Sequence, residues 1–181
     1  MKFNFTPFPI LKTERLILRQ ACINDCKEVF FLRSNEEVNK YVKRPTPQSI
    51  TDAQNFIDKI NKGIKNGENL YWCISLKVSK QMIGSISLWN FSEDKKTGEI
   101  GYDLHPKNQN HGIMSEALNC VINFGFDRLN LNIIEAYTHH SNESSKRLLT
   151  KHHFEHIKDR IDKDNTDNII YQLKKPVTDN H

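Results

Sequence analysis

The part of the sequence best suited to bind a ligand is residues 105–118, where a polar loop with one glycine, Gly112, leads into an apolar helical pattern. The first backbone N–H groups of a helix have no partner within it, and the helix dipole adds positive potential there. A phosphate can bind at such a helix start without a charged side chain. The pattern therefore predicts an anion-binding loop, with an ordinary turn that uses a glycine as the alternative.

Strands and helices must hold this loop in place. Strand patterns are expected at residues 16–19, 71–76, 82–89, 99–104, 133–138, 154–161 and 169–173. Helix patterns are expected after a cap at Asn24, from a capping box of Thr51 and Gln54 to a stop at Gly67, and over residues 112–129 and 144–152. Residues 34–50 contain two prolines and are expected to be mostly irregular.

The order of these elements predicts the fold class. Short turns join the three middle strands, which favours an antiparallel meander. The strand–helix–strand unit over residues 99–138 implies one parallel pair in the same sheet. We therefore expect a mixed α/β sheet, mostly antiparallel. A doubly wound dinucleotide fold is excluded, because no helices separate the strands of the meander.

Length and charge narrow the function classes. The chain has 181 residues, which suits one domain with a proper core. The formal net charge is +4, but basic and acidic residues are interspersed, which argues against a nucleic-acid-binding protein. The sequence holds no apolar run of the roughly 18 residues that span a bilayer, and its start lacks an apolar signal segment. We expect a cytoplasmic protein with no membrane partner.

Seven short motifs follow one another at residues 11–19, 83–86, 99–102, 109–118, 134–136, 142–145 and 149–154. Among them, Gln109-x-x-Gly112 matches a Q/R-x-x-G-x-G/A signature, and residues 115–118 match its usual continuation. In this order and spacing they resemble the Gcn5-related N-acetyltransferases (GNAT), and within them the branch that acetylates the amino termini of ribosomal proteins. The resemblance implies one GNAT domain at residues 9–174, with a splayed parallel strand pair and terminal extensions at 1–8 and 175–181.

The resemblance also implies that the chain binds acetyl-CoA and needs no metal. The pyrophosphate is expected on backbone amides of the signature loop, which comprises Gln109, Asn110, His111, Gly112, Ile113 and Met114. The pantetheine arm is expected beside the end of the preceding strand, at Asp103, Leu104 and His105. Asn142 is expected to help position the cofactor.

Acetyl transfer to an amine needs the amine in its neutral form. A terminal α-amine has a pKa of about 8 and lysine about 10.4, so an α-amine needs only modest help from a base. The resemblance assigns the base to Glu99 and the acid for the leaving thiolate to Ser145, with Tyr102 as a rival acid. Tyr102 and Tyr41 are also candidate acceptor-binding residues. The transfer is expected to be direct, without a covalent acyl-enzyme.

Two positions depart from the family pattern. Met114 stands where the signature has glycine or alanine, so its side chain crowds the phosphate or points into the core. His153 stands where the family usually has a helix-ending glycine with positive φ, which histidine tolerates better than most residues.

Several alternatives stay open. The acceptor is expected to be a protein amino terminus, but a small-molecule amine (a polyamine, an amino acid or an antibiotic) is a second possibility, and a non-catalytic CoA-binding module a third. The protein is expected to be a monomer or a homodimer. Adjacent histidines on a strand point to opposite faces, so His139 and His140 do not predict a metal site, although either could line the acceptor groove.

Overall fold

The computed structural model describes residues 2–176, so residues 177–181 of the expected terminal extension lie outside the described part. Eight strands form one sheet in the order β1-β2-β3-β4-β5-β6-β8-β7. The strands are β1 (Leu11–Lys12), β2 (Leu16–Gln20), β3 (Leu70–Leu76), β4 (Met82–Trp89), β5 (Thr97–Leu104), β6 (Ile133–His139), β7 (Glu155–His156) and β8 (Asn168–Lys174). Every neighbouring pair is antiparallel except β5 and β6, which confirms the predicted mixed sheet.

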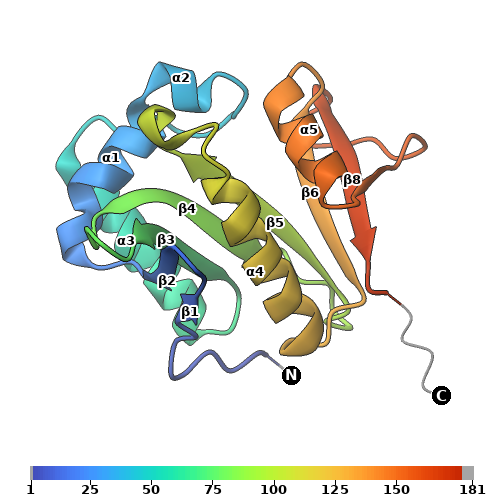
Figure 1. Ribbon diagram of the computed structural model, residues 1–181, viewed down its shortest axis with the longest axis horizontal. Coiled ribbons are helices and arrows are strands. Elements are labelled where there is room, and N and C mark those ends of the chain that lie inside the picture. Colours follow the sequence, from blue (N-terminus) through green and yellow to red (C-terminus); the bar gives the residue numbers. More distant parts are fainter. Residues whose placement is uncertain (1, 177–181) are drawn as a thin grey trace.

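The helices cover both faces of the sheet (Figure 1). They are α1 (Cys26–Ser34), α2 (Glu36–Asn39), α3 (Ile50–Lys65), α4 (Ile113–Asp127) and α5 (Glu143–Lys151), with 3-10 turns at Ile23–Asp25 and Pro106–Asn108. Successive residues of a strand face opposite ways, so on β3 Trp72 packs in the core under α4, whereas Cys73 packs in the core formed with α1 and α3. Within residues 2–176, every helix is too short or too polar to cross a membrane.

The first helix begins later than the sequence suggests. The prediction that Asn24 caps it is wrong, because a 3-10 turn precedes α1 and Asp25 stands at its N-cap. The Asp25 carboxylate instead accepts the backbone N–H of Cys22 at 2.9 Å and pairs with Arg19 at 2.7 Å. These bonds hold Asp25 inward and delay the start of the helix.

The capping box of α3 is also displaced, by two residues. Ser49, not Thr51, caps the helix, with its hydroxyl accepting the N–H of Asp52 at 3.3 Å and the Asp52 carboxylate accepting the N–H of Ser49 at 3.0 Å. Ser49 has the extended backbone that an N-cap needs. The predicted stop is confirmed, since Gly67 follows the helix with a φ of 69°.

Two segments differ from their predicted form. The stretch expected to be irregular contains the short helix α2, capped by Asn35, whose side chain accepts the N–H of Val38 at 3.0 Å. The expected strand at 154–161 is only the two residues of β7, so residues 157–167 form a long loop before β8. This loop turns out to border the candidate site.

Candidate functional site

The parallel strands β5 and β6 separate near the middle of the sheet. Their ladder covers three residue pairs, from Thr97 opposite Ile133 to Glu99 opposite Glu135. Beyond these pairs β5 continues to Leu104 and β6 to His139, so the carboxyl ends of the two strands diverge. The divergence leaves backbone N–H and C=O groups along the inner edge of β5 without a strand partner on that side.

The signature loop lies at the end of β5 and leads into α4. Gly112 is the N-cap of α4 and has the left-handed conformation, with a φ of 73°. A Cβ atom added to Gly112 would have Arg15 Nη2 as its nearest neighbour, at 3.5 Å. The space beside the helix start is therefore open, and the first N–H groups of α4 are accessible to a ligand.

The side chain of Met114 points away from the loop. Met114 and Ile113 are 8% and 5% exposed, and both belong to the core under α4. Of the two alternatives for Met114, the structure therefore shows the core position. Ile113 and Met114 can offer a ligand only their backbone N–H groups. His153, the other departure, has a φ of 63°, as expected at a position where the family has glycine.

Side chains at the end of β5 hold the backbone in place. The Gln109 amide donates to the carbonyl oxygen of Leu104 at 3.2 Å, which ties the loop to the strand. The Asp103 carboxylate accepts from Arg44 at 3.0 Å and from Ser85 at 2.6 Å. Asp103 and Gln109 are thus occupied by the protein, and their ligand-binding capacity lies in the backbone.

Two further predicted cofactor-binding residues, His105 at the strand end and His111 in the signature loop, are also placed by contacts. The His105 ring stacks on Phe31 with ring centroids 4.4 Å apart. The carbonyl oxygen of His111 accepts from Arg15 Nη1 at 3.0 Å. Asn110, between the 3-10 turn and Gly112, has a φ of 61°.

Arg15 is a site residue that the sequence did not single out. Its guanidinium lies beside the start of α4, where it donates to His111 and pairs with Glu116 at 2.7 Å. The Glu116 carboxylate also accepts from the Thr13 hydroxyl at 2.5 Å, so the chain before β2 is bound to the first turn of α4. Nothing in the local sequence of Arg15 indicates a contact with a segment so far along the chain.

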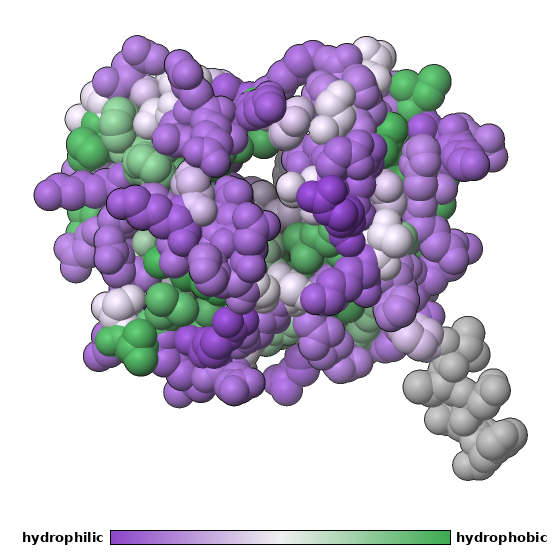
Figure 2. Space-filling view, turned by 45° about the horizontal axis from the view of Figure 1, so that its top comes forward, coloured by the Kyte–Doolittle hydropathy of each residue, from purple (hydrophilic) through white to green (hydrophobic). Residues whose placement is uncertain are grey.

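A second group of predicted residues meets in a cavity of about 980 Å³. Its lining includes Tyr41, Glu99, Tyr102, Asn142 and Ser145, which come from three separate segments of the chain. In Figure 2 the molecule is hollowed between the part that carries α1 and α2 and the part that carries α5. The structure therefore brings both predicted catalytic residues and both predicted acceptor residues together.

Glu99 is half-buried in the wall of this cavity. Desolvation raises the pKa of its carboxyl to about 7, and the charges of Asp162 and Glu135 act in the same direction. Asn90 opposes them by donating to the carboxylate at 3.1 Å. A carboxyl with a pKa near neutrality can accept a proton at physiological pH and later release it.

Ser145 and Tyr102 form one hydrogen-bonded pair. Their hydroxyl oxygens are 2.8 Å apart, and Ser145 is 9% exposed. Burial raises the pKa of Tyr102 to about 12, so its hydroxyl stays protonated at neutral pH. Asn142 caps α5 and accepts the N–H of Ser145 at 3.1 Å, and so fixes the turn that carries this serine.

The two adjacent histidines do not point apart as expected. β6 ends at His139, and beyond it the chain turns, so the rings of His139 and His140 stack with centroids 4.5 Å apart. Within residues 2–176, these histidines and Asp167 place three possible ligand atoms within 4.8 Å of one another. Asp167 already pairs with Lys43 at 2.9 Å. Tyr41 packs against His139, 5.3 Å between ring centroids, at the edge of the cavity.

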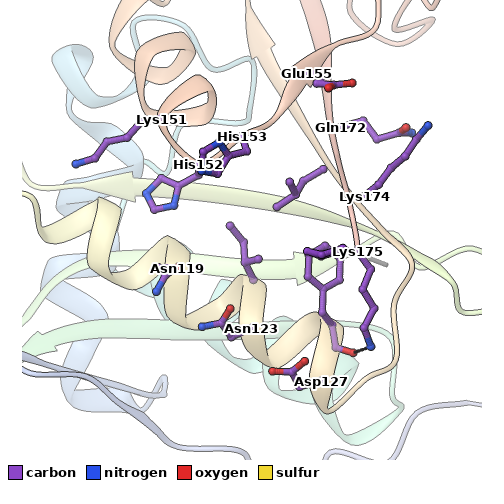
Figure 3. A pocket seen from close by; sticks show the side chains of 14 residues that line it. Asn119, Asn123, Asp127, Lys151, His152, His153, Glu155, Gln172, Lys174 and Lys175 are labelled. Atoms are coloured by element: carbon purple, nitrogen blue, oxygen red, sulfur yellow. Dashed lines mark hydrogen bonds between the residues drawn. The ribbon is translucent and has the colours of Figure 1, made fainter. Parts of the chain in front are cut away.

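Another hollow, of about 650 Å³, lies between α4 and the end of α5 (Figure 3). Asn119, Asn123 and Asp127 follow one another along α4 on one side, and His152 and Lys175 lie opposite. None of the predicted cofactor or catalytic residues lines it. The chemically competent groups thus gather in the cavity around Glu99 and in the loop before α4.

Comparisons with known proteins agree with this geometry. Residues 15–155 match the family model of the acetyltransferase (GNAT) domain. The uncharacterized N-acetyltransferase YoaA of Bacillus subtilis (strain 168) is 34% identical over 148 residues, which is 82% of this chain and 84% of the relative.

Solved structures have the same fold. A GNAT-family acetyltransferase from Bacillus anthracis has a TM-score of 0.76 at 26% identity, with 92% of this chain and 98% of that chain covered. RimL, a ribosomal L7/L12 α-N-protein acetyltransferase in complex with coenzyme A, has a TM-score of 0.78 at 17% identity, with 92% and 98% covered. Because the sequence identity with RimL is only 17%, this similarity shows a shared fold and nothing more.

Proposed function

The chain belongs to the acetyltransferase (GNAT) domain family and is an acetyl-CoA-dependent N-acetyltransferase, and we propose that its acceptor is the amino-terminal α-amine of a protein, with ribosomal proteins as the first candidates. The ribosomal assignment is supported by the sequence resemblance and by the shared fold with the L7/L12 acetyltransferase. The observation that carries the proposal is the meeting of Glu99 with the Tyr102–Ser145 pair in one cavity.

In this proposal acetyl-CoA lies where β5 and β6 diverge. The pantetheine amides bind the backbone along the free edge of β5 near Asp103 and Leu104. The predicted role of the His105 backbone is not supported, because its N–H already donates to the carbonyl oxygen of Ile83 and its carbonyl accepts from Asn108, each at 2.8 Å. The pyrophosphate binds the N–H groups between Gln109 and Met114, where the open space at Gly112 lets the anion approach. The Arg15 guanidinium, whose charge is balanced by Glu116, holds the loop beside this helix start through its hydrogen bond to the His111 carbonyl.

Glu99 acts as the general base. The α-amine, whose pKa is about 8, reacts in its neutral form, and its nitrogen attacks the thioester carbonyl carbon. As the C–S bond breaks and the acetyl group passes directly to nitrogen, the nitrogen loses one proton to the Glu99 carboxylate, whose pKa is about 7. The leaving thiolate takes a proton from the Tyr102–Ser145 pair, and Glu99 later releases its proton to solvent.

The Tyr102–Ser145 pair serves the leaving thiolate. Ser145 is placed by the Asn142 cap at the start of α5, and its hydroxyl shares a hydrogen bond with the protonated Tyr102. A proton donated by Ser145 can be replaced from Tyr102, so the two rival acids become one relay.

The test is a search for acceptors. Purified protein is mixed with acetyl-CoA and a thiol reagent, and CoA release is followed with a panel of short peptides that have free amino termini and with polyamines. Turnover of peptides, with mass spectrometry showing acetylation of the α-amine, supports the proposal. Turnover of small amines alone would replace the acceptor, and a complete absence of CoA release would favour the non-catalytic CoA-binding module.

A further inference from the structure

The cavity around Glu99 has charged groups of both signs, and ion pairs decide which sign remains. Its cationic lining residues are Lys43, Arg160 and Lys163, and its carboxylates are Glu99, Asp159, Asp162 and Asp164. All but two of these residues come from the loop 157–167 between β7 and β8. The charge of the acceptor pocket therefore depends mainly on this loop.

Arg160 is neutralised from outside the cavity. Both of its terminal nitrogens donate to the Glu135 carboxylate on β6, and one also donates to the Tyr137 hydroxyl at 3.2 Å. Glu135 is 8% exposed and does not line the cavity. This pair fastens the loop to β6 and removes the positive charge of Arg160 from the pocket.

Lys43 is neutralised in the same way. Its ammonium donates to Asp167 at 2.9 Å and to Asn165 at 3.0 Å. Asp167 is not a lining residue either. The segment after α2 is thus fastened to the other end of the loop, and a second positive charge is cancelled by a carboxylate outside the pocket.

The lining carboxylates are not cancelled by ion pairs. Within residues 2–176, none of the four takes part in an ion pair. Asp162 is half-buried and held in place, since it accepts the N–H of Asp164 at 3.0 Å and the amide of Asn168 at 2.8 Å. Its charge also contributes to the raised pKa of Glu99, so the two carboxylates are within electrostatic reach of each other.

The pocket is therefore locally negative on a chain whose formal net charge is +4. Within residues 2–176, three aspartates, together with Glu99 when it is ionised, face one lining ammonium without a counter-ion, that of Lys163. A concave, partly desolvated wall concentrates such a field and draws cations toward it. This is the same cavity that holds the catalytic groups, so the field acts on the acceptor itself.

We propose that the enzyme selects acceptors with a second positive charge close to the reacting amine, an inference that rests on the proposed function. Asp162 and Asp164 bind this second charge. In a protein amino terminus, the second charge is a lysine or arginine side chain at the second or third residue. A polyamine presents the same pair of charges, so the assay has separate arms for peptides and for spermidine.

The experiment compares matched acceptors at pH 8. Peptides of sequence Ser-Lys-Ala-Tyr, Ser-acetyllysine-Ala-Tyr and Ser-Glu-Ala-Tyr, with amidated carboxyl ends, differ only in the second side chain, which is cationic, neutral and anionic in turn. We expect kcat/KM for the lysine peptide to exceed that for the acetyllysine peptide by about tenfold, mainly through KM, and the glutamate peptide to be poorest. The preference should shrink as salt screens the charges.

Two variants test whether Asp162 and Asp164 bind the second charge. Asp162→Asn removes the half-buried charge, and Asp164→Asn removes an exposed charge whose carboxylate accepts no hydrogen bond from the described residues, so its removal does not disturb the loop. Both should lower the ratio of lysine to acetyllysine peptide. Asp58→Asn, an exposed charge on α3, is the matched control and should leave that ratio unchanged.

The outcomes separate this inference from the proposed function. Equal kcat/KM for the lysine and acetyllysine peptides, with both acetylated, overturns the second-charge proposal and leaves the acetylation of amino termini standing. A preference that survives in both loop variants overturns the assignment to Asp162 and Asp164. Turnover of spermidine without any peptide supports the second charge but overturns the protein acceptor.

Discussion

Replacing Glu99 by glutamine tests the central step of the mechanism. Glutamine has nearly the same shape, and its side-chain oxygen can still accept the hydrogen bond from Asn90. It cannot take a proton from the amine. Loss of a positioned base costs roughly 10²- to 10⁴-fold in rate, so kcat/KM for a peptide acceptor at pH 8 should fall within that range.

The pH dependence makes the test sharper. With a pKa of about 7, Glu99 is ionised in about nine-tenths of molecules at pH 8 and about one-tenth at pH 6. The ratio of wild-type to Glu99→Gln kcat/KM should therefore fall about ninefold between pH 8 and pH 6. Ionisation of the acceptor amine affects both proteins alike and cancels in the ratio.

Stability provides the control for folding. Burial raises the Glu99 pKa from 4.5 to about 7, so the folded state binds this proton more tightly than the unfolded state. Glu99 therefore reduces the free energy of unfolding as the pH rises through this window. Glu99→Gln should be more stable than wild type at pH 8, by about 1 to 3 kcal/mol after allowance for solvent screening, and similar to it near pH 4.5.

The assay is CoA release with a thiol reagent at acceptor concentrations below KM, together with urea denaturation at both pH values. An unchanged rate in the variant would remove Glu99 from the base role. A ratio that does not vary between pH 6 and pH 8 would show that the carboxyl does not titrate in this range, and the argument from burial would be wrong.

Three further predictions concern the rest of the site. Ser145→Ala and Tyr102→Phe should each lower kcat by about tenfold or more. The double variant should be little worse than the poorer single variant, because the two hydroxyls act through one hydrogen bond. Steady-state kinetics of the three variants measures these effects. Gly112→Val should raise the Kd for CoA, measured by calorimetry, because a side chain at a φ of 73° costs about 1 to 2 kcal/mol and reshapes the start of α4. Arg44→Met should reduce the free energy of unfolding by about 3 kcal/mol in urea denaturation, because it leaves the Asp103 carboxylate buried without its partner.

Each of these predictions can fail separately. Additive losses in Ser145→Ala and Tyr102→Phe would mean that the hydroxyls act independently. Equal CoA affinity in Gly112→Val would place the pyrophosphate elsewhere. An Arg44→Met protein as stable as wild type would mean that the Asp103 charge is solvated well enough without its partner. Lys2→Met, which removes one partner of an exposed ion pair, is the control and should leave the free energy of unfolding nearly unchanged.

The order of the elements could be predicted from the sequence because periodicity is a local signal. The meander, the single parallel pair and the helix after Gly112 all follow from apolar patterns within short windows. The predicted first residues of the helices were less accurate. At α1 the outcome depended on the bond between Asp25 and Arg19, which the helix pattern does not contain. The expected strand at 154–161 extends into the loop 157–167, because the local sequence does not show that pairing with β8 covers only Glu155 and His156.

The sequence by itself determined the fold class and the family resemblance, and through that resemblance it named Glu99, Gly112 and Ser145 as candidates, since short motifs depend on neighbours along the chain. Only the tertiary structure decided the direction of the Met114 side chain, because the core that receives it is built from distant strands.

The charge of the acceptor pocket was likewise decided by the tertiary structure. The total of +4 is a sum over residues, whereas the field at Glu99 depends on which charges face it and which are cancelled. The pairs of Lys43 with Asp167 and of Arg160 with Glu135 join segments far apart in the chain. Charge balance in a cavity follows from distances in space, and these distances are set only when the chain has folded.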